Sequence, residues 1–322
     1  MKHSLSITLM LVGFFVVAQI FGVLIVNQYV DVQKSVEMGE TVFKDLPTVG
    51  GVVFERPDVE ENVSFLYVFL AILVGTVILL LMIKFAKWLW KPWFFMAISL
   101  SLYFAFAPFV PVLFAGVLAL FLAAMKLIGP RSMLSITFGN IAELFIYGGL
   151  SAIFVPIFNL WAVSGLLLLI SLWDMWAVWK GGVMVTMAKH QISSGAFAGL
   201  SIPYVRPKVM RKTRKKSTKK HIHIRAGKKA PRLHTTARKE KMSTAILGGG
   251  DIAIPLFFTA TVLKAMGLIS ALLVIPFTTI ALFMLLYFAE QNKFYPAMPF
   301  LSGGCFVGFA VVWLLQVVGV LA

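Results

Sequence analysis

The chain has 322 residues, of which 60% are hydrophobic and only 13% are charged, and this composition excludes a soluble globular protein with an ordinary polar surface. Its 29 lysines and arginines outnumber its 13 acidic residues. We therefore expect an integral membrane protein whose apolar side chains face lipid. The single cysteine, Cys305, excludes an intrachain disulfide.

Nine apolar segments are long enough to cross, or nearly cross, a hydrocarbon core of roughly 30 Å. The first is as long as a membrane span and is followed by no small-residue cleavage site, so we expect a retained helix rather than a signal peptide. The predicted fold is an all-α polytopic membrane protein with nine transmembrane helices. The predicted segments are residues 7–26, 64–83, 93–107, 112–125, 132–154, 162–178, 244–263, 268–289 and 299–322.

A basic segment separates the sixth and seventh predicted helices. Residues 180–241 contain eighteen lysines and arginines and one acid, Glu240. The chain thus divides into helices 1–6 (residues 1–179), a loop that we expect to be largely disordered (180–243), and helices 7–9 (244–322). Anionic lipids attract such a segment beside a membrane, and we prefer them to nucleic acid as its partner. Its histidines lie in this solvated charge run without cysteines, so no metal or other cofactor is expected.

The distribution of basic residues also predicts the orientation. With the N-terminus in the cytoplasm, the cytoplasmic side holds 25 of the 29 basic residues. When the eighteen of the long loop are discounted, seven against four still favour this orientation. Residues 27–63, on the external side, carry eight acids and three basic residues. We predict a multi-pass protein of the cell membrane, with the C-terminus outside and the 180–243 loop in the cytoplasm.

Acids inside hydrocarbon are costly and rare, so each one in a predicted helix is a functional candidate. Four acids lie outside the loops: Glu143, Asp174, Asp251 and Glu290. Glu290 is at a helix end and is interpreted as an interfacial charge. Glu143 lies near Asn140 in the fifth helix, and we favour a buried polar contact with a neighbouring helix over a third catalytic acid.

The two remaining acids are predicted to lie at one depth. Asp174 comes six residues before Lys180, about 9 Å from the cytoplasmic edge, and Asp251 comes ten residues after Lys241, at most about 15 Å inward. Two such acids that share a proton hydrolyse an amide, because the ionised one accepts a proton from water while the neutral one protonates the carbonyl oxygen. On depth alone, a proton relay or a structural pair is an equally good interpretation.

Three glycines, Gly248, Gly249 and Gly250, come directly before Asp251. Glycine permits positive φ angles and the close approach of another backbone, which suits a site that holds an extended peptide. A flexible helix start is the alternative. The four residues resemble the Gly-x-Gly-Asp motif of presenilins and signal peptide peptidases.

Two further segments share this resemblance. Trp173-Asp174 is similar to the family's other catalytic segment, normally Tyr-Asp, and here lacks the tyrosine hydroxyl. Pro296-Ala297-Met298 is similar to the family's Pro-Ala-Leu motif. The three motifs occur in the family's order, on the predicted sixth, seventh and ninth helices. The resemblance implies an intramembrane aspartyl protease with two catalytic aspartates, whose substrates are transmembrane helices, and the predicted orientation favours an archaeal presenilin homologue.

Two alternatives are open. A prepilin or preflagellin peptidase is also a membrane aspartyl enzyme with Gly-x-Gly-Asp, but it has fewer helices and no Pro-Ala-Leu element. A transporter or proton-coupled channel would also use two intramembrane acids, and it would show paired repeats with broken helices.

Substrate binding raises a separate expectation, because a transmembrane helix must unwind before water reaches its peptide bonds. Unwinding in lipid leaves N–H and C=O groups without partners, and a strand edge would supply them. Thr244, Ala245, Ile246 and Leu247, just before the glycines, are candidates for such a strand. We expect these residues to form the first turn of the seventh helix and to become a strand only with a substrate.

Overall fold

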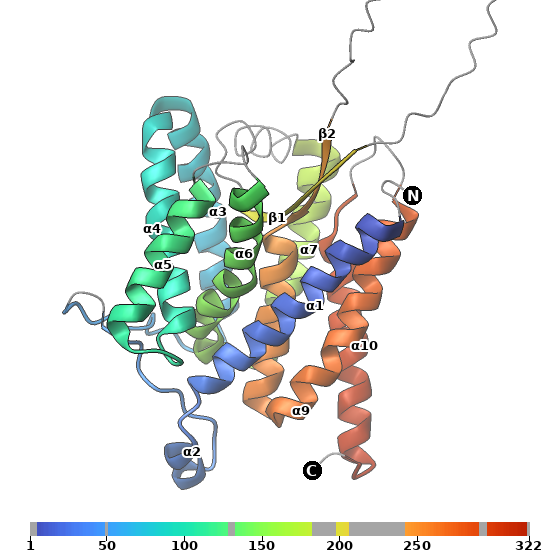
Figure 1. Ribbon diagram of the computed structural model, residues 1–322. Coiled ribbons are helices and arrows are strands. Elements are labelled where there is room, and N and C mark those ends of the chain that lie inside the picture. The colour runs from blue at the N-terminus through green and yellow to red at the C-terminus, as the bar shows by residue number, and fades with distance from the viewer. Residues whose placement is uncertain are drawn as a thin grey trace, which may run out of the picture.

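The computed structural model describes residues 5–48, 51–127, 133–181, 198–205, 242–289 and 295–320. This part of the chain is mostly helical and contains one two-stranded antiparallel sheet (Figure 1). The elements in chain order are α1 (Leu5–Gln28), α2 (Val32–Met38), α3 (Ser64–Phe85), η1 (Lys87–Leu89), α4 (Trp90–Phe106), α5 (Val112–Leu127), α6 (Met133–Phe154), η2 (Val155–Ile157), α7 (Leu160–Trp176), η3 (Ala177–Gly181), β1 (Gly199–Val205), β2 (Met242–Gly248), α9 (Gly250–Phe288) and α10 (Met298–Val317).

Seven helices of the described residues are long and apolar enough to cross a membrane. They are α1, α3, α4 together with η1, α6, the region of α7, α9 and α10; α5 is apolar but shorter. Because water is absent from the bilayer core, a spanning backbone must form its hydrogen bonds internally, and a helix does so. A mostly helical membrane protein, as predicted, is therefore the observed class.

Helix α9 has 39 residues and contains a break. Gly267 has a φ of 84° and a ψ of 173°, a non-helical conformation that favours glycine. In Figure 1 the first part of α9 descends from the sheet, turns, and returns beside α10. The two parts correspond to the predicted seventh and eighth helices, except that the first begins at Gly250 rather than at Thr244.

Two segments that were predicted to be loops contain regular structure. In residues 27–63, α2 forms because Asp31 caps it by accepting a hydrogen bond from the Lys34 N–H at 3.2 Å, and because Gly39, with a φ of 71°, ends it. In residues 180–243, η3 extends into the start of the segment, β2 begins at its end, and β1 lies within it. The predicted lipid contact of the remaining basic residues at 206–241 and the predicted interfacial Glu290 lie outside the described residues.

The helices pack around two adjoining hydrophobic clusters. The larger one is formed by α1, α6, α7, α9 and α10, and the smaller one joins α4 and α5 to α6. Helix α1 approaches α9 closely because Gly22 has no side chain: a Cβ there would lie 2.2 Å from Leu256. Small residues allow such close packing between membrane helices. Helix α3, which packs on α7, has only Ser64 and Val68 buried, so it lies at the periphery of the helix assembly.

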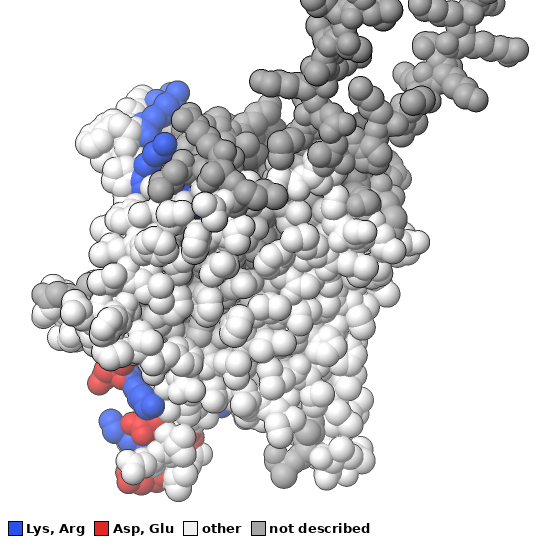
Figure 2. Space-filling view, viewed as in Figure 1, with Lys and Arg blue, Asp and Glu red and all other residues white. Residues whose placement is uncertain are grey.

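The charged residues of the visible face gather at its two ends (Figure 2). In this view a band without visible charged side chains lies between them, as expected for a surface that contacts lipid. Helix α1 begins at one end of the molecule and α10 finishes at the other (Figure 1).

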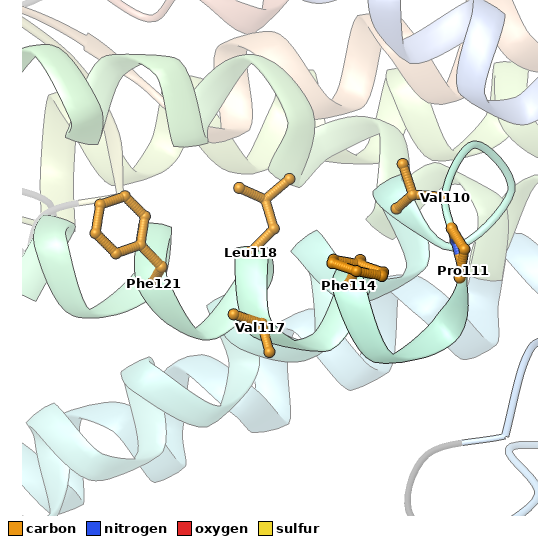
Figure 3. A pocket seen from close by; sticks show the side chains of 6 residues that line it. All are labelled: Val110, Pro111, Phe114, Val117, Leu118 and Phe121. Carbon is orange, nitrogen blue, oxygen red and sulfur yellow. The ribbon is translucent and has the colours of Figure 1, made fainter.

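Within the apolar surface, an open groove of about 490 Å³ runs along α5 (Figure 3). It is lined by Val110, Pro111, Phe114, Val117, Leu118 and Phe121.

Candidate active site

The structure brings the two predicted acids together. Asp174 lies near the C-terminal end of α7, and Asp251 lies in the first turn of α9. The two helices pack against each other. Both side chains are partly buried. Two carboxylates from distant parts of the sequence therefore form one site.

Asp174 is held by the start of α10. The Met298 N–H donates a hydrogen bond to Asp174 Oδ2 at 3.0 Å, and the Ala297 backbone also hydrogen-bonds this carboxylate. The first N–H groups of a helix have no partner within it and attract anions. Pro296 comes just before these residues, and Pro299 lies in the first turn of α10, where proline is tolerated. The predicted Pro-Ala-Met segment thus lies beside Asp174.

Two further contacts define the surroundings of Asp174. Ser171 Oγ and Ser302 Oγ are 2.8 Å apart, which joins α7 to α10 about one turn from the carboxylate. The ring of Trp173 stacks on that of Trp176, with 5.0 Å between their centroids. Trp173, which stands where the family normally has tyrosine, therefore belongs to an aromatic pair at the end of α7, and we propose it as a residue that shapes the site.

The three glycines before Asp251 differ in their surroundings. The Gly248 backbone hydrogen-bonds the Asp251 carboxylate, and a Cβ on Gly248 would lie 3.2 Å from Asp251 Oδ2. A Cβ on Gly249 would lie 2.7 Å from the Tyr147 hydroxyl oxygen, whereas one on Gly250 would meet nothing within 4 Å. None of the three has a positive φ. The close approach at Gly249 is to a side chain rather than to another backbone, and none of the three glycines uses the positive φ that glycine permits.

The segment before the glycines is a strand. Thr244, Ala245, Ile246 and Leu247 lie in β2, which pairs with β1 of the same chain. Ala245 and Leu247 are buried together with Leu200 and Ile202 of β1, whereas Thr244 is exposed and Ile246 partly so. This alternation is that of a strand with one buried face. The expectation of a helical turn that becomes a strand only with a substrate is wrong, because β1 supplies the backbone partners.

Helix α6 holds the other edge of β1. The Ser201 N–H donates to Asn140 Oδ1 at 3.0 Å, and Asn140 Nδ2 donates to the Ser201 carbonyl at 2.9 Å. The Gly199 N–H donates to Glu143 Oε1 at 2.9 Å. Glu143 also forms an ion pair with Lys126 of α5, which confirms the predicted buried contact with a neighbouring helix. The link from α6 to the strand was not predicted.

These contacts determine which edge of the sheet is open. The N–H groups of Gly199 and Ser201 point to α6 and therefore away from β2. In the sheet, Gly199 lies opposite Gly248 and Ser201 lies opposite Ile246. Both are thus the pairs of an antiparallel ladder that exchange no hydrogen bonds with each other. The backbone groups of Ile246 then point away from β1. Among the described strands β2 pairs only with β1, so its second edge is open on the side of the Asp251 carboxylate.

Two acids lie on adjacent helices, one bound by the start of α10 and the other preceded by a strand, an arrangement that is compatible with aspartyl proteolysis. Comparison with protein families agrees: residues 13–318 match the family described as "Signal-peptide peptidase, presenilin aspartyl protease". The chain belongs to this family, and its function is that of an intramembrane aspartyl protease. This assignment favours the protease over the transporter and the prepilin peptidase.

Solved structures show the same fold. The chain is similar to a presenilin family intramembrane aspartate protease in a C222 crystal form, with a TM-score of 0.57 and 15% identity over 96% of this chain and 99% of the other. A P2 crystal form of a presenilin family intramembrane aspartate protease gives a TM-score of 0.56 and 16% identity, over 97% of this chain and 98% of the other. No significant match was found among curated proteins.

Proposed function

We propose that Asp174 and Asp251 are the catalytic pair and hydrolyse a peptide bond within a transmembrane segment of a substrate protein. The observation that carries this proposal is the placement of two partly buried acids on helices that pack against each other, one at the end of α7 and the other at the start of α9. The ionised acid accepts a proton from water while the neutral acid protonates the substrate carbonyl. This enzyme is then of the Gly-x-Gly-Asp type.

The open edge of β2 is proposed to bind the unwound substrate. Backbone groups of Ile246 point away from β1, toward the side on which Gly248 meets Asp251. A substrate strand that pairs with this edge regains the hydrogen bonds that it loses on unwinding, and its chain then runs toward the aspartates. The sheet is already formed, so the substrate adds a third strand to it.

The proposed topology has nine crossings, counted as the seven long helices, one for α5 and one more for the second part of α9. An N-terminus in the cytoplasm is supported by Figure 2, in which the visible charged side chains at the end where α1 begins are basic, whereas acidic and basic side chains lie together at the opposite end. Residues 180–243 are then cytoplasmic and contact anionic lipids of the cell membrane. An archaeal source belongs to the same proposal.

The test is cleavage of a panel of single-helix membrane substrates by the purified protein. Asp174→Asn and Asp251→Asn should each abolish cleavage, whereas Asp31→Asn, which removes an acid at the cap of α2, should not. The rate of the chemical step should fall on both sides of a pH optimum, because one acid must be ionised and the other neutral. Cleavage that survives either catalytic-site variant would refute the assignment.

A further inference from the structure

A buried charged cluster lies behind the sheet, on the side away from its open edge. Glu143 of α6 is 1% exposed, and its partner Lys126 of α5 is 8% exposed as a side chain. Glu143 also accepts hydrogen bonds from the Tyr147 hydroxyl and from the Gly199 N–H. One carboxylate therefore joins α5, α6 and β1. Removing such an ion pair from water costs free energy. Well-packed apolar residues in the same place would often stabilise a fold at least as much as the ion pair does.

The contacts of this cluster lead to the catalytic segment by two routes. The first runs from Glu143 to Gly199, which lies opposite Gly248 in the sheet. The second runs from Glu143 to Tyr147, whose ring lies against Gly249. Gly249 is itself tied to the base of β1, since its N–H donates to the Ala198 carbonyl at 3.2 Å. Both routes end at the residues that precede Asp251.

We propose that Glu143 is a positioning residue for proteolysis: its carboxylate, held by Lys126 and Tyr147, fixes the Gly199 end of the sheet and the glycine turn, and so aligns Asp251 with the open edge of β2. This inference rests on the proposed function of that edge and of the aspartates. Asn140, one turn earlier on α6, holds Ser201 independently. Loss of Glu143 should therefore loosen the end of β1 nearest the catalytic site and leave the rest of the strand paired.

The test uses two double variants that carry no buried charge in this cluster. Lys126→Met with Glu143→Ala removes the acceptor for the Gly199 N–H, whereas Lys126→Met with Glu143→Gln keeps an amide oxygen that is able to accept it. The first should turn over a single-helix substrate more slowly than wild type, on the order of 10- to 100-fold, because small misplacements of catalytic groups are costly. The second should retain most of the wild-type rate.

Hydrogen exchange measured at the individual backbone amides of residues 198–205 gives a readout that does not depend on cleavage. In the Ala variant the Gly199 amide should exchange faster by on the order of tenfold or more, since it loses a hydrogen bond to a charged group, while the Ser201 amide keeps its protection. Wild-type turnover in the Ala variant, or equal losses in both double variants, would overturn the positioning role. If instead wild-type cleavage did not depend on Asp174 and Asp251, the proposed function would fail, and the exchange experiment would still report on the anchoring.

Discussion

Replacing Gly249 by alanine tests why the sequence has glycine next to the catalytic segment. The backbone of Gly249 has a φ of −64° and a ψ of −34°, so alanine is compatible with its conformation. The added Cβ would lie 2.7 Å from the Tyr147 hydroxyl oxygen and 3.2 and 3.3 Å from two ring carbons. Tyr147 is 4% exposed and bonded to Glu143, so it has little room to move.

Overpacking of a buried site costs about 1–3 kcal/mol. The smaller conformational freedom of alanine in the unfolded chain offsets about 0.4–1 kcal/mol of this. We expect Gly249→Ala to lower the free energy of unfolding by about 1–2 kcal/mol and to slow cleavage. Gly250→Ala is the matched control, because a Cβ there would meet nothing within 4 Å, and it should be neutral or slightly stabilising.

The assays are the thermal unfolding midpoint of the purified protein and its cleavage rate on one substrate. Adding Tyr147→Phe to Gly249→Ala removes the nearest atom, so the two substitutions together should be less harmful than the sum of their separate effects. If Gly249→Ala and Gly250→Ala behaved alike in both assays, the glycines would serve chain flexibility, and the inference from close packing would be wrong.

Three further substitutions test other parts of the fold. Ile246→Pro should impair cleavage more than Ile246→Val in the cleavage assay, because proline removes an N–H from the open edge of β2. Gly304→Ala should lower the unfolding midpoint by a few degrees, since its Cβ would lie 2.8 Å from Ala281 of α9, whereas Gly303→Ala, with nothing within 4 Å, should not. Lys264→Met should lower the free energy of unfolding by about 1–3 kcal/mol, because the Lys264 ammonium group donates hydrogen bonds to one carboxylate and two backbone carbonyls. Lys34→Met is the control and should have little effect, because Lys34 forms only an exposed ion pair, 4.0 Å from Asp31.

The membrane class and the two acids of the site could be predicted from the sequence because hydrocarbon imposes strong constraints. Long apolar segments have few alternatives to the helix in a bilayer, and an acid such as Asp174 or Asp251 inside one is rare enough to be conspicuous. The family resemblance pointed to the Pro296-Ala297-Met298 segment, but the backbone hydrogen bonds that this segment makes to Asp174 were not predicted. Nothing in the local sequence near residue 297 indicates a carboxylate partner.

The sheet was missed for a physical reason. The alternation of buried Leu200 and Ile202 with more exposed neighbours is a strand signal, but it occupies only a few residues in a long basic segment whose composition predicts disorder. Its stability comes from tertiary contacts with Asn140 and Glu143, which local propensity does not report. The same holds for Thr244 to Leu247, whose apolar character suits a helix start as well as a strand.

The pairing of Val205 with Met242 at the outer end of the sheet also bears on how this protein can change in evolution. The chain leaves the sheet at Val205 and re-enters it at Met242, so the two ends of the intervening segment lie next to each other. The entropy of closing such a loop grows only with the logarithm of its length, about 0.6 kcal/mol for each doubling. Insertions and deletions in this segment should therefore accumulate among homologues without displacing Asp251, and the loop length is free to diverge while the site is retained.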